Sequence, residues 1–488
     1  EPFLLWNEWL PPGLLRPVVS LVEVVGIPLT TGGLDNPEVW VTSANNLISL
    51  VMILTVTALY SATGGLRSVA ATDVVQIGIM FLGTVAFTTI VVREVGGLSA
   101  MTDRVYEMFA AGGPGGILPD EILAFTPDQG KDVTLTVLSL LGLLWLINSV
   151  SDGSGYLAQR AMACRSDRDA KTAAVVFTFT QVLIRSLIWL PLGVGLLVLF
   201  PPNPGLAPDL LQADREATYV RGMAELLPRG VMGLMLTGML AALASTVDTH
   251  LNWGASYWTN DIYKRFVCQA WLKTEPSGRA LVWVARAANV LILVIALAIM
   301  TQLTSINQAW QINLLFGAGL GGVLVLRWLW WRMNAWAEIA AMVVSSLVAP
   351  PLMIYLDDEQ QALRLLLAAT VSTLAALAAI WVKGPEDEAR LTSFYTRVRP
   401  VGFWGPVARA AGAADDHGPR RLWRALAAMV LCSLTVFCLL VGVGTWLVGS
   451  PPPVWLPSRP IWIGGLLLLG LALCPFWYRL GYGRDSDR

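Results

Sequence analysis

The chain carries the stretch Tyr60-Ser-Ala-Thr-Gly-Gly-Leu-Arg-Ser-Val-Ala-Ala-Thr-Asp-Val-Val-Gln76 between two apolar runs, residues 44–62 and 73–92. Each run is long enough to cross the hydrocarbon core of a bilayer as a helix, which takes about 20 residues. The paired glycines favour a sharp reversal at a helix end, and the Thr-Asp pair favours a cap on the next helix. The stretch therefore predicts two membrane helices joined by a tight turn.

Further apolar runs of similar length follow along the chain, which predicts about eleven transmembrane helices in all. The composition agrees, because 55% of the 488 residues are hydrophobic and 14% are charged, whereas about a quarter of the residues of a soluble protein are charged. The fold class is therefore predicted to be an all-α polytopic membrane protein. The further runs are residues 133–151, 172–200, 229–257, 281–303, 309–326, 336–356, 361–382, 425–448 and 460–478.

Several functional classes are excluded by the composition and by missing motifs. The net charge is -1, which gives no reason to expect a nucleic-acid partner. The two histidines and five cysteines show no metal-ligand spacing, so no transition-metal site is expected. No nucleophile-and-base arrangement and no phosphate-binding loop is visible, so the chain is not expected to be an enzyme or to bind an organic cofactor. No protein partner is evident either, and the expected surroundings are the lipid bilayer.

The basic residues predict the orientation of the chain in the membrane. Of the 33 lysines and arginines, 22 lie on one set of alternate loops, including eight between Lys383 and Arg424, and nine lie on the other set. Cytoplasmic loops carry the excess of positive charge. We therefore expect a multi-pass protein of the cell (inner) membrane with a cytoplasmic C-terminus. Residues 94–132 and 201–228 are then outer loops, and residues 383–424 form a cytoplasmic connector that lies on the membrane surface.

Three blocks together resemble the sodium/solute symporter family, of the sodium/proline and sodium/sugar symporter type. The first is Tyr60 to Gln76, with its Tyr, Gly-Gly and Thr-Asp-x-x-Gln pattern. The second is Gly155-Tyr-Leu-Ala-Gln-Arg160 and its continuation to Ala170, and the third extends from Leu227 to Phe266. The blocks cover about residues 45–330, while the part beyond resembles only a bacterial subset of unknown substrate.

The resemblance implies a core of two inverted five-helix repeats. Aligned in this way, the run at 44–62 corresponds to the fourth core helix, so the first three core helices are expected to be largely absent, as in a fragment or, alternatively, a natural short variant. The expected organisation is an outer segment, the symporter core, additional transmembrane helices, the cytoplasmic connector, and two C-terminal transmembrane helices with a tail. These parts correspond to residues 1–43, 44–330, 331–382, 383–424 and 425–488.

Candidate sodium ligands lie in the third block. Ala242, Ser245 and Thr246 share one helical face and offer one carbonyl and two hydroxyl oxygens, the ligands that a hard cation such as Na⁺ prefers. The alternative is that these small residues only let two helices approach closely. Asp73 is a candidate for cation coupling by resemblance, with a simple helix cap as its alternative, and Gln76 is expected to pack.

Candidate substrate residues are the polar side chains that interrupt the apolar helices. The resemblance points to Asn148, Ser149 and Gln181, and a polar cluster adds Trp310 and Gln311, with an interfacial Trp and solvated amides as the alternative. Arg185 and Asp248 lie inside spans, where ionisable groups are costly. We expect them to form an ion pair, and the alternative is that Arg185 meets a substrate carboxylate.

These observations predict a secondary transporter that couples sodium movement to the uptake of a small organic solute by alternating access. Sodium is then the co-transported ion. Two alternatives remain: proton coupling through Asp73, and a membrane sensor or scaffold that keeps the fold without translocation. The identity of the solute does not follow from the sequence.

Overall fold

A computed structural model of the chain describes most of its residues, and secondary structure in the described part is helical apart from one isolated bridge between Trp330 and Phe403. The described residues are 6–26, 29, 38–113, 116–125, 160–203, 205–206, 208–300, 303, 306–356, 360–413, 417–453, 455–456 and 458–483.

Nine helical stretches in the described part are long and apolar enough to cross a membrane, and a shorter apolar stretch covers Val39–Ile53. They confirm the predicted all-α membrane fold, while the span expected at 133–151 lies outside the described residues. The nine are Ala71–Val95, Asp167–Leu199, Arg229–Trp271, Gly278–Ala296, Gln308–Leu329, Ala335–Tyr355, Gln361–Lys383, Gly418–Val448 and Arg459–Tyr482.

The tight turn predicted at the paired glycines is wrong, because helix α3 runs from Val39 to Val95 without a break. A glycine costs a helix only about 1 kcal/mol relative to alanine, and glycines are common in membrane helices. Two of them do not break a helix of 57 residues. Asp73 consequently lies inside α3 and caps no helix.

The chain forms two structural units, of which the first comprises residues 1–91 and 205–308. Its N-terminal residues Trp6 and Asn7 are tied to the first part of α3, since Trp6 Nε1 donates to Ser49 Oγ at 2.8 Å and Asn45 Nδ2 donates to Asn7 Oδ1 at 2.8 Å. The helices of this unit are α1 (Trp6–Trp9), α2 (Pro12–Val25), most of α3, α10 (Pro208–Leu226), α11 (Arg229–Ser256), its π-helical continuation η4 (Tyr257–Trp271) and α12 (Gly278–Met300).

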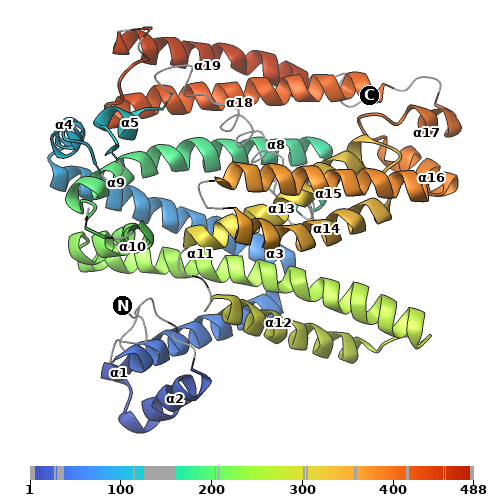
Figure 1. Cartoon of the computed structure of the whole chain (residues 1–488), viewed down its shortest axis with the longest axis horizontal. Helices are drawn as coiled ribbons and strands as arrows, with labels where there is room; N and C mark the ends of the chain where they lie inside the picture. The colour runs from blue at the N-terminus through green and yellow to red at the C-terminus, as the bar shows by residue number, and fades with distance from the viewer. Residues whose placement is uncertain are drawn as a thin grey trace. The chain divides into compact units, whose positions relative to one another are not determined.

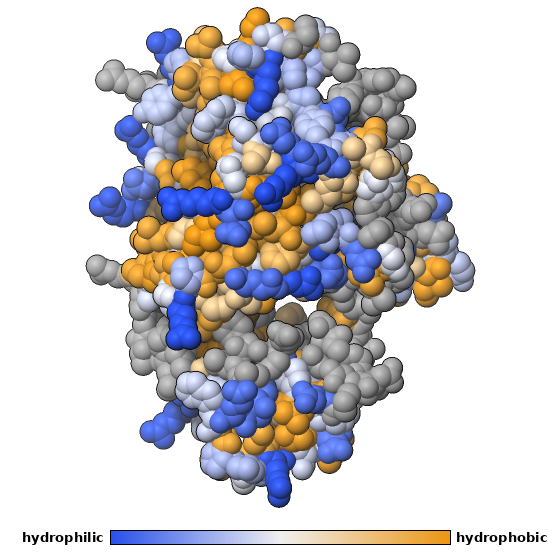
Figure 2. Space-filling view, turned by 90° about the vertical axis from the view of Figure 1, so that its left-hand side faces the viewer, coloured by the Kyte–Doolittle hydropathy of each residue, from blue (hydrophilic) through white to orange (hydrophobic). Residues whose placement is uncertain are grey.

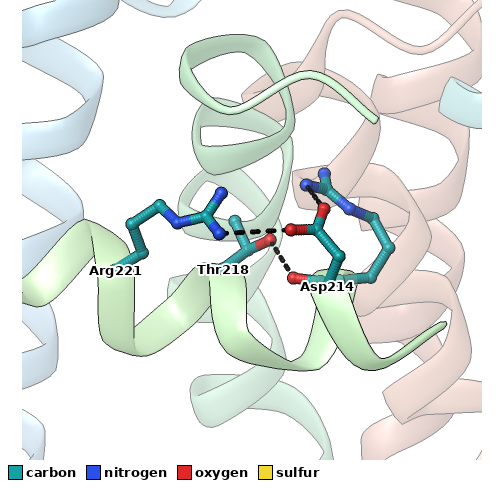
Figure 3. Close-up of polar contacts among 4 residues, drawn as sticks. Asp214, Thr218 and Arg221 are labelled. Carbon is teal, nitrogen blue, oxygen red and sulfur yellow. Dashed lines mark hydrogen bonds and ion pairs between the residues drawn. The ribbon is translucent and has the colours of Figure 1, made fainter. Parts of the chain in front are cut away.

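Helix α10 lies within the predicted outer loop 201–228 and is held by a small ionic cluster. Asp214 accepts hydrogen bonds from Arg215 at 2.9 Å and Arg221 at 3.2 Å, and Thr218 Oγ1 donates to the Asp214 carbonyl at 3.0 Å (Figure 3). The hydrogen bond from Arg215, with that from Arg221, holds the pKa of Asp214 below its ordinary value although burial opposes the shift. The carboxylate therefore stays charged at neutral pH and fixes this stretch of α10.

The second unit comprises residues 92–204 and 309–488. Two pairs of helices, α14 with α15 and α18 with α19, lie side by side in antiparallel fashion (Figure 1). The unit contains the end of α3, α4 (Leu98–Phe109), α5 (Pro119–Leu123), α8 (Asp167–Thr178), the π-helix η3 (Phe179–Ile184), α9 (Arg185–Leu199), most of α13 (Ile306–Leu329), α14 (Ala335–Tyr355), α15 (Gln361–Lys383), α16 (Glu388–Val398), α17 (Gly405–Ala410), α18 (Gly418–Val448) and α19 (Arg459–Tyr482).

Helix α4 contacts the C-terminal end of α18, since Thr102 Oγ1 donates to Val448 O at 3.1 Å. At the opposite end of the α18–α19 pair, Tyr482 at the end of α19 lies 3.4 Å from Thr172 Oγ1. The structure thus places Thr102 of α4 beside the C-terminal end of α18 and Thr172 of α8 beside the C-terminal end of α19.

The face shown in Figure 2 carries hydrophilic side chains among hydrophobic ones. Along the spans, many large apolar side chains are exposed. On α19, for example, Leu468 is 71% exposed and Leu471 is 61% exposed. Exposed apolar side chains in such numbers are unfavourable in water and are expected on helices that face lipid.

Candidate functional site

Helices α3 and α11 pack closely against each other in the first unit because glycines face side chains across their interface. A Cβ added at Gly238 would lie 3.2 Å from Met80 Cγ, and one added at Gly83 would lie 2.6 Å from Met235 Sδ. Small residues allow such close approach of membrane helices. The two contacts also show that the helices run antiparallel, since residue numbers rise on α3 as they fall on α11.

The same register brings together two residues that the sequence predicts for cation binding. Ser245 Oγ on α11 donates a hydrogen bond to Asp73 Oδ1 on α3 at 2.6 Å, and both residues are half-buried. A carboxylate and a hydroxyl oxygen from separate helices thus lie within direct contact. An ionisable side chain within an apolar span is costly and marks a functional site by default.

The other two candidate sodium ligands are bonded to each other. Thr246 Oγ1 donates to the Ala242 carbonyl at 2.9 Å, and His250 Nδ1 lies 2.8 Å from the Thr246 carbonyl. The Thr246 hydroxyl oxygen keeps lone pairs available, whereas the Ala242 carbonyl already accepts a side-chain hydrogen bond. A role for this carbonyl as a cation ligand would therefore need Thr246 to turn away.

Gln76 has a functional feature that sequence reasoning missed. It was expected to pack, but its Oε1 atom is buried and has no hydrogen-bond partner. Gln76 lies one turn from Asp73 on the same face of α3, and the antiparallel register places it level with Ala242. The signal available in the sequence was a polar residue three positions after Asp73 in an apolar run. A buried oxygen without a donor is costly and suits a cation.

The substrate candidate Gln181 lies in η3, a π-helical segment within the span Asp167–Leu199. With its amide oxygen turned toward the guanidinium of Arg185, that oxygen accepts from Nη1 at 2.7 Å and from Nη2 at 3.3 Å. Single turns of π-helix inside membrane helices often mark functional sites. The side chain of Asp248 lies outside the described residues, so its pairing with Arg185 stays a prediction.

The remaining substrate candidates are not brought together by contacts that the structure describes. Trp310 is 60% exposed on α13, and Gln311 beside it is half-buried. Asn148 and Ser149 lie outside the described residues. The substrate set therefore stays a prediction.

The amino-acid sequence is similar to those of several known transporters. The chain is 28% identical to a sodium/glucose cotransporter of Vibrio parahaemolyticus over 67% of this chain and 58% of that protein. It is 26% identical to the osmoregulated proline transporter OpuE of Bacillus subtilis, over 62% of this chain and 56% of that protein. It is 25% identical to the sodium/proline symporter of Escherichia coli, over 60% of this chain and 54% of that protein. The chain thus spans little more than half the length of these relatives.

A solved structure of a Na⁺-coupled sialic acid symporter, in a substrate-bound outward-open state, is also similar. The TM-score is 0.49 with 20% sequence identity, and the alignment covers 70% of this chain and 67% of that chain.

The profile of the sodium:solute symporter family matches residues 41–345, which is more than half of the chain. This match confirms the resemblance found in the three sequence blocks. The family consists of transporters, which also confirms that the chain is not an enzyme. By this match, the chain belongs to the sodium:solute symporter family.

Proposed function

We propose that this protein is a sodium-coupled symporter that moves a small organic solute across the cell membrane by alternating access. The observation that carries the proposal is the contact between the Asp73 carboxylate and the Ser245 hydroxyl within the α3–α11 interface. Membership of a symporter family supports it, as do relatives that carry glucose or proline by name.

The cation binds between α3 and α11 in this proposal. Sodium is a hard cation that prefers oxygen ligands, and the interface offers the Asp73 carboxylate and the Ser245 hydroxyl. The buried Gln76 Oε1 lies one turn further along α3. Thr246 and the Ala242 carbonyl, one turn apart on α11, complete the set of candidates. When sodium enters, the Ser245 hydroxyl turns its lone pair to the ion and its proton away from Asp73.

The solute binds to the residues predicted for it, which are Gln181 on η3, Trp310 and Gln311 on α13, and Asn148 and Ser149. Arg185, which contacts Gln181, joins them in the alternative in which it meets a substrate carboxylate. The amide groups and the guanidinium recognise polar groups of the solute, and Trp310 stacks on its apolar face. Sodium and solute affinities are then linked, because each ligand raises the affinity for the other by the same factor.

Binding of ²²Na⁺ to the purified protein, measured on both sides of neutral pH, tests the proposal. A sodium symporter binds sodium saturably with an affinity that changes little across that range. If sodium fails to bind while a proton gradient drives solute accumulation in proteoliposomes, Asp73 carries a proton instead. Saturable sodium binding without sodium-driven solute accumulation in proteoliposomes would support the sensor alternative.

The proposal places the 160–171 loop and the C-terminus in the cytoplasm, and a native cysteine in that loop allows a direct test. Cys164 is partly exposed. In a variant whose other four cysteines are replaced, a membrane-impermeant maleimide should leave Cys164 unlabelled in intact cells and label it after permeabilisation. A cysteine placed at the exposed Glu225 on α10 should be labelled in both cases. The reverse pattern would overturn the orientation.

A further inference from the structure

A cavity of about 310 Å³ lies in the connector between α15 and α18 and shares no residue with the proposed transport site. The end of α16, the end of α17 and the first turn of α18 surround it. Its polar lining consists of Tyr395, Thr396, Arg399, His417 and Arg421. The volume falls at the lower end of the range for small-molecule sites, about 300–1,000 Å³.

The loop that forms one wall is held by backbone contacts. Arg399 ends α16 in the left-handed conformation, with φ 46° and ψ 58°, which is costly for a residue other than glycine. Arg421 Nη1 donates to the Arg399 carbonyl at 3.2 Å, and Gly402 N donates to the Gly418 carbonyl at 3.2 Å. These bonds fix the arginine-bearing loop against the start of α18, so the cavity is preformed.

The end of helix α13 supports the same loop. Phe403 N donates to the Leu329 carbonyl at 2.6 Å, and Trp404 Nε1 donates to the Trp328 carbonyl at 3.0 Å. Gly402 has a φ of 112°, and a Cβ there would overlap the Leu329 backbone. Only glycine therefore permits this close approach.

The charged side chains that line the cavity in the described part of the chain are two arginines. Among the described residues, no carboxylate forms an ion pair with Arg399 or Arg421. His417 is the N-cap residue of α18, and the first N–H groups of a long helix favour an anion. Two guanidinium groups that share a cavity repel each other unless an anion lies between them.

We propose that this cavity binds a phosphate group. Arginines are matched to phosphate because their planar forks donate two parallel hydrogen bonds to its oxygens, and two of them balance a phosphate that carries one or two negative charges. The phosphate belongs either to the headgroup of an anionic phospholipid or to a soluble phosphate compound. Trp423 on α18 and Phe403 are 67% and 54% exposed, and aromatic side chains of this kind lie at the membrane surface.

The test uses the full chain in neutral detergent and does not depend on transport. Potassium phosphate is compared with potassium chloride at equal ionic strength, and micelles containing phosphatidylglycerol are compared with micelles containing phosphatidylcholine. A ligand that binds only the folded protein raises its unfolding temperature. We expect stabilisation by phosphate, by phosphatidylglycerol or by both, and the arm that responds identifies the source.

The variant Arg399→Gln, Arg421→Gln should weaken this binding at least tenfold. Arg409→Gln is the matched control, because Arg409 is an exposed arginine of the same connector that does not line the cavity. If the glutamine variant does not fold, Arg399→Lys, Arg421→Lys keeps the charge but loses the forked geometry, and it should still weaken binding. Asp415→Asn, Asp416→Asn should bind at least as tightly, since these acids adjoin His417 in the sequence.

Three results would overturn the proposal. The first is that neither phosphate nor phosphatidylglycerol stabilises the protein. The second is that the double arginine variant responds as the original protein does. The third is that Arg409→Gln loses the response equally, which would show attraction to the general positive charge of the connector.

Discussion

Replacing Asp73 with Asn should lower the sodium affinity of the purified protein at least tenfold, equivalent to about 1.4 kcal/mol. The substitution keeps the shape of the side chain but removes the negative charge beside the Ser245 hydroxyl. Ser245→Ala should have an effect of the same size, because it removes one oxygen ligand and leaves the carboxylate without its donor. Since the two groups form one site, the double variant should lose less than the sum of the two single losses.

Thr237→Ala is the matched control for these variants. Thr237 lies on α11 like Ser245, but its hydroxyl donates to the Gly233 carbonyl on its own helix, at 2.8 Å. The Thr237→Ala variant should bind sodium with the affinity of the original protein. A folded Asp73→Asn variant with an unchanged sodium titration would place the cation site elsewhere.

Gln76→Met extends this test to the unpartnered amide. The change removes a buried oxygen that has no donor, so it should not lower the stability of the sodium-free protein. It should lower the sodium affinity, because the cation loses a ligand. A variant with unaltered affinity would mean that Gln76 only packs.

Gly319→Ala should destabilise the second unit by about 1–3 kcal/mol. Its Cβ would overlap the side chains of Ser345 on α14 and Ser372 on α15. Both serines are buried, and Ser345 Oγ donates to the Phe316 carbonyl at 3.1 Å. The three helices therefore meet where no further carbon fits, and the added methyl group has to push them apart.

Gly322→Ala provides the contrast on the same helix. A Cβ there would lie 3.6 Å from Thr373 Oγ1, an ordinary contact. Because alanine favours a helix over glycine by about 1 kcal/mol, this variant should be as stable as the original protein or slightly more stable. Thermal unfolding of both variants in detergent decides the matter, and equal unfolding temperatures would contradict the proposed packing.

The membrane class and the family could be predicted from the sequence because both depend on local information. Long apolar runs define the spans through the cost of burying charge in lipid, and short motifs such as Thr72-Asp73 with Gln76 carry the family signal. The positions of Ser245 and Asp73 as candidates followed from the same motifs. Neither prediction required knowing which helices touch.

The contacts between helices required the tertiary structure. Whether the glycine pair at 64 and 65 turns the chain or continues a helix depends on packing that outweighs about 1 kcal/mol per glycine, and α3 continues. Asp73 and Ser245 are 172 positions apart in the sequence, and the antiparallel packing of α3 and α11 brings them into contact. The folded chain also leaves Gln76 Oε1 buried without a donor. The sequence alone selected Asp73, Ser245 and Thr246 as candidates for cation binding, because their side chains carry oxygen atoms. The packing of α3 against α11 decided that the Asp73 carboxylate and the Ser245 hydroxyl touch, because side-chain contacts between distant segments are set by shape and not by local pattern.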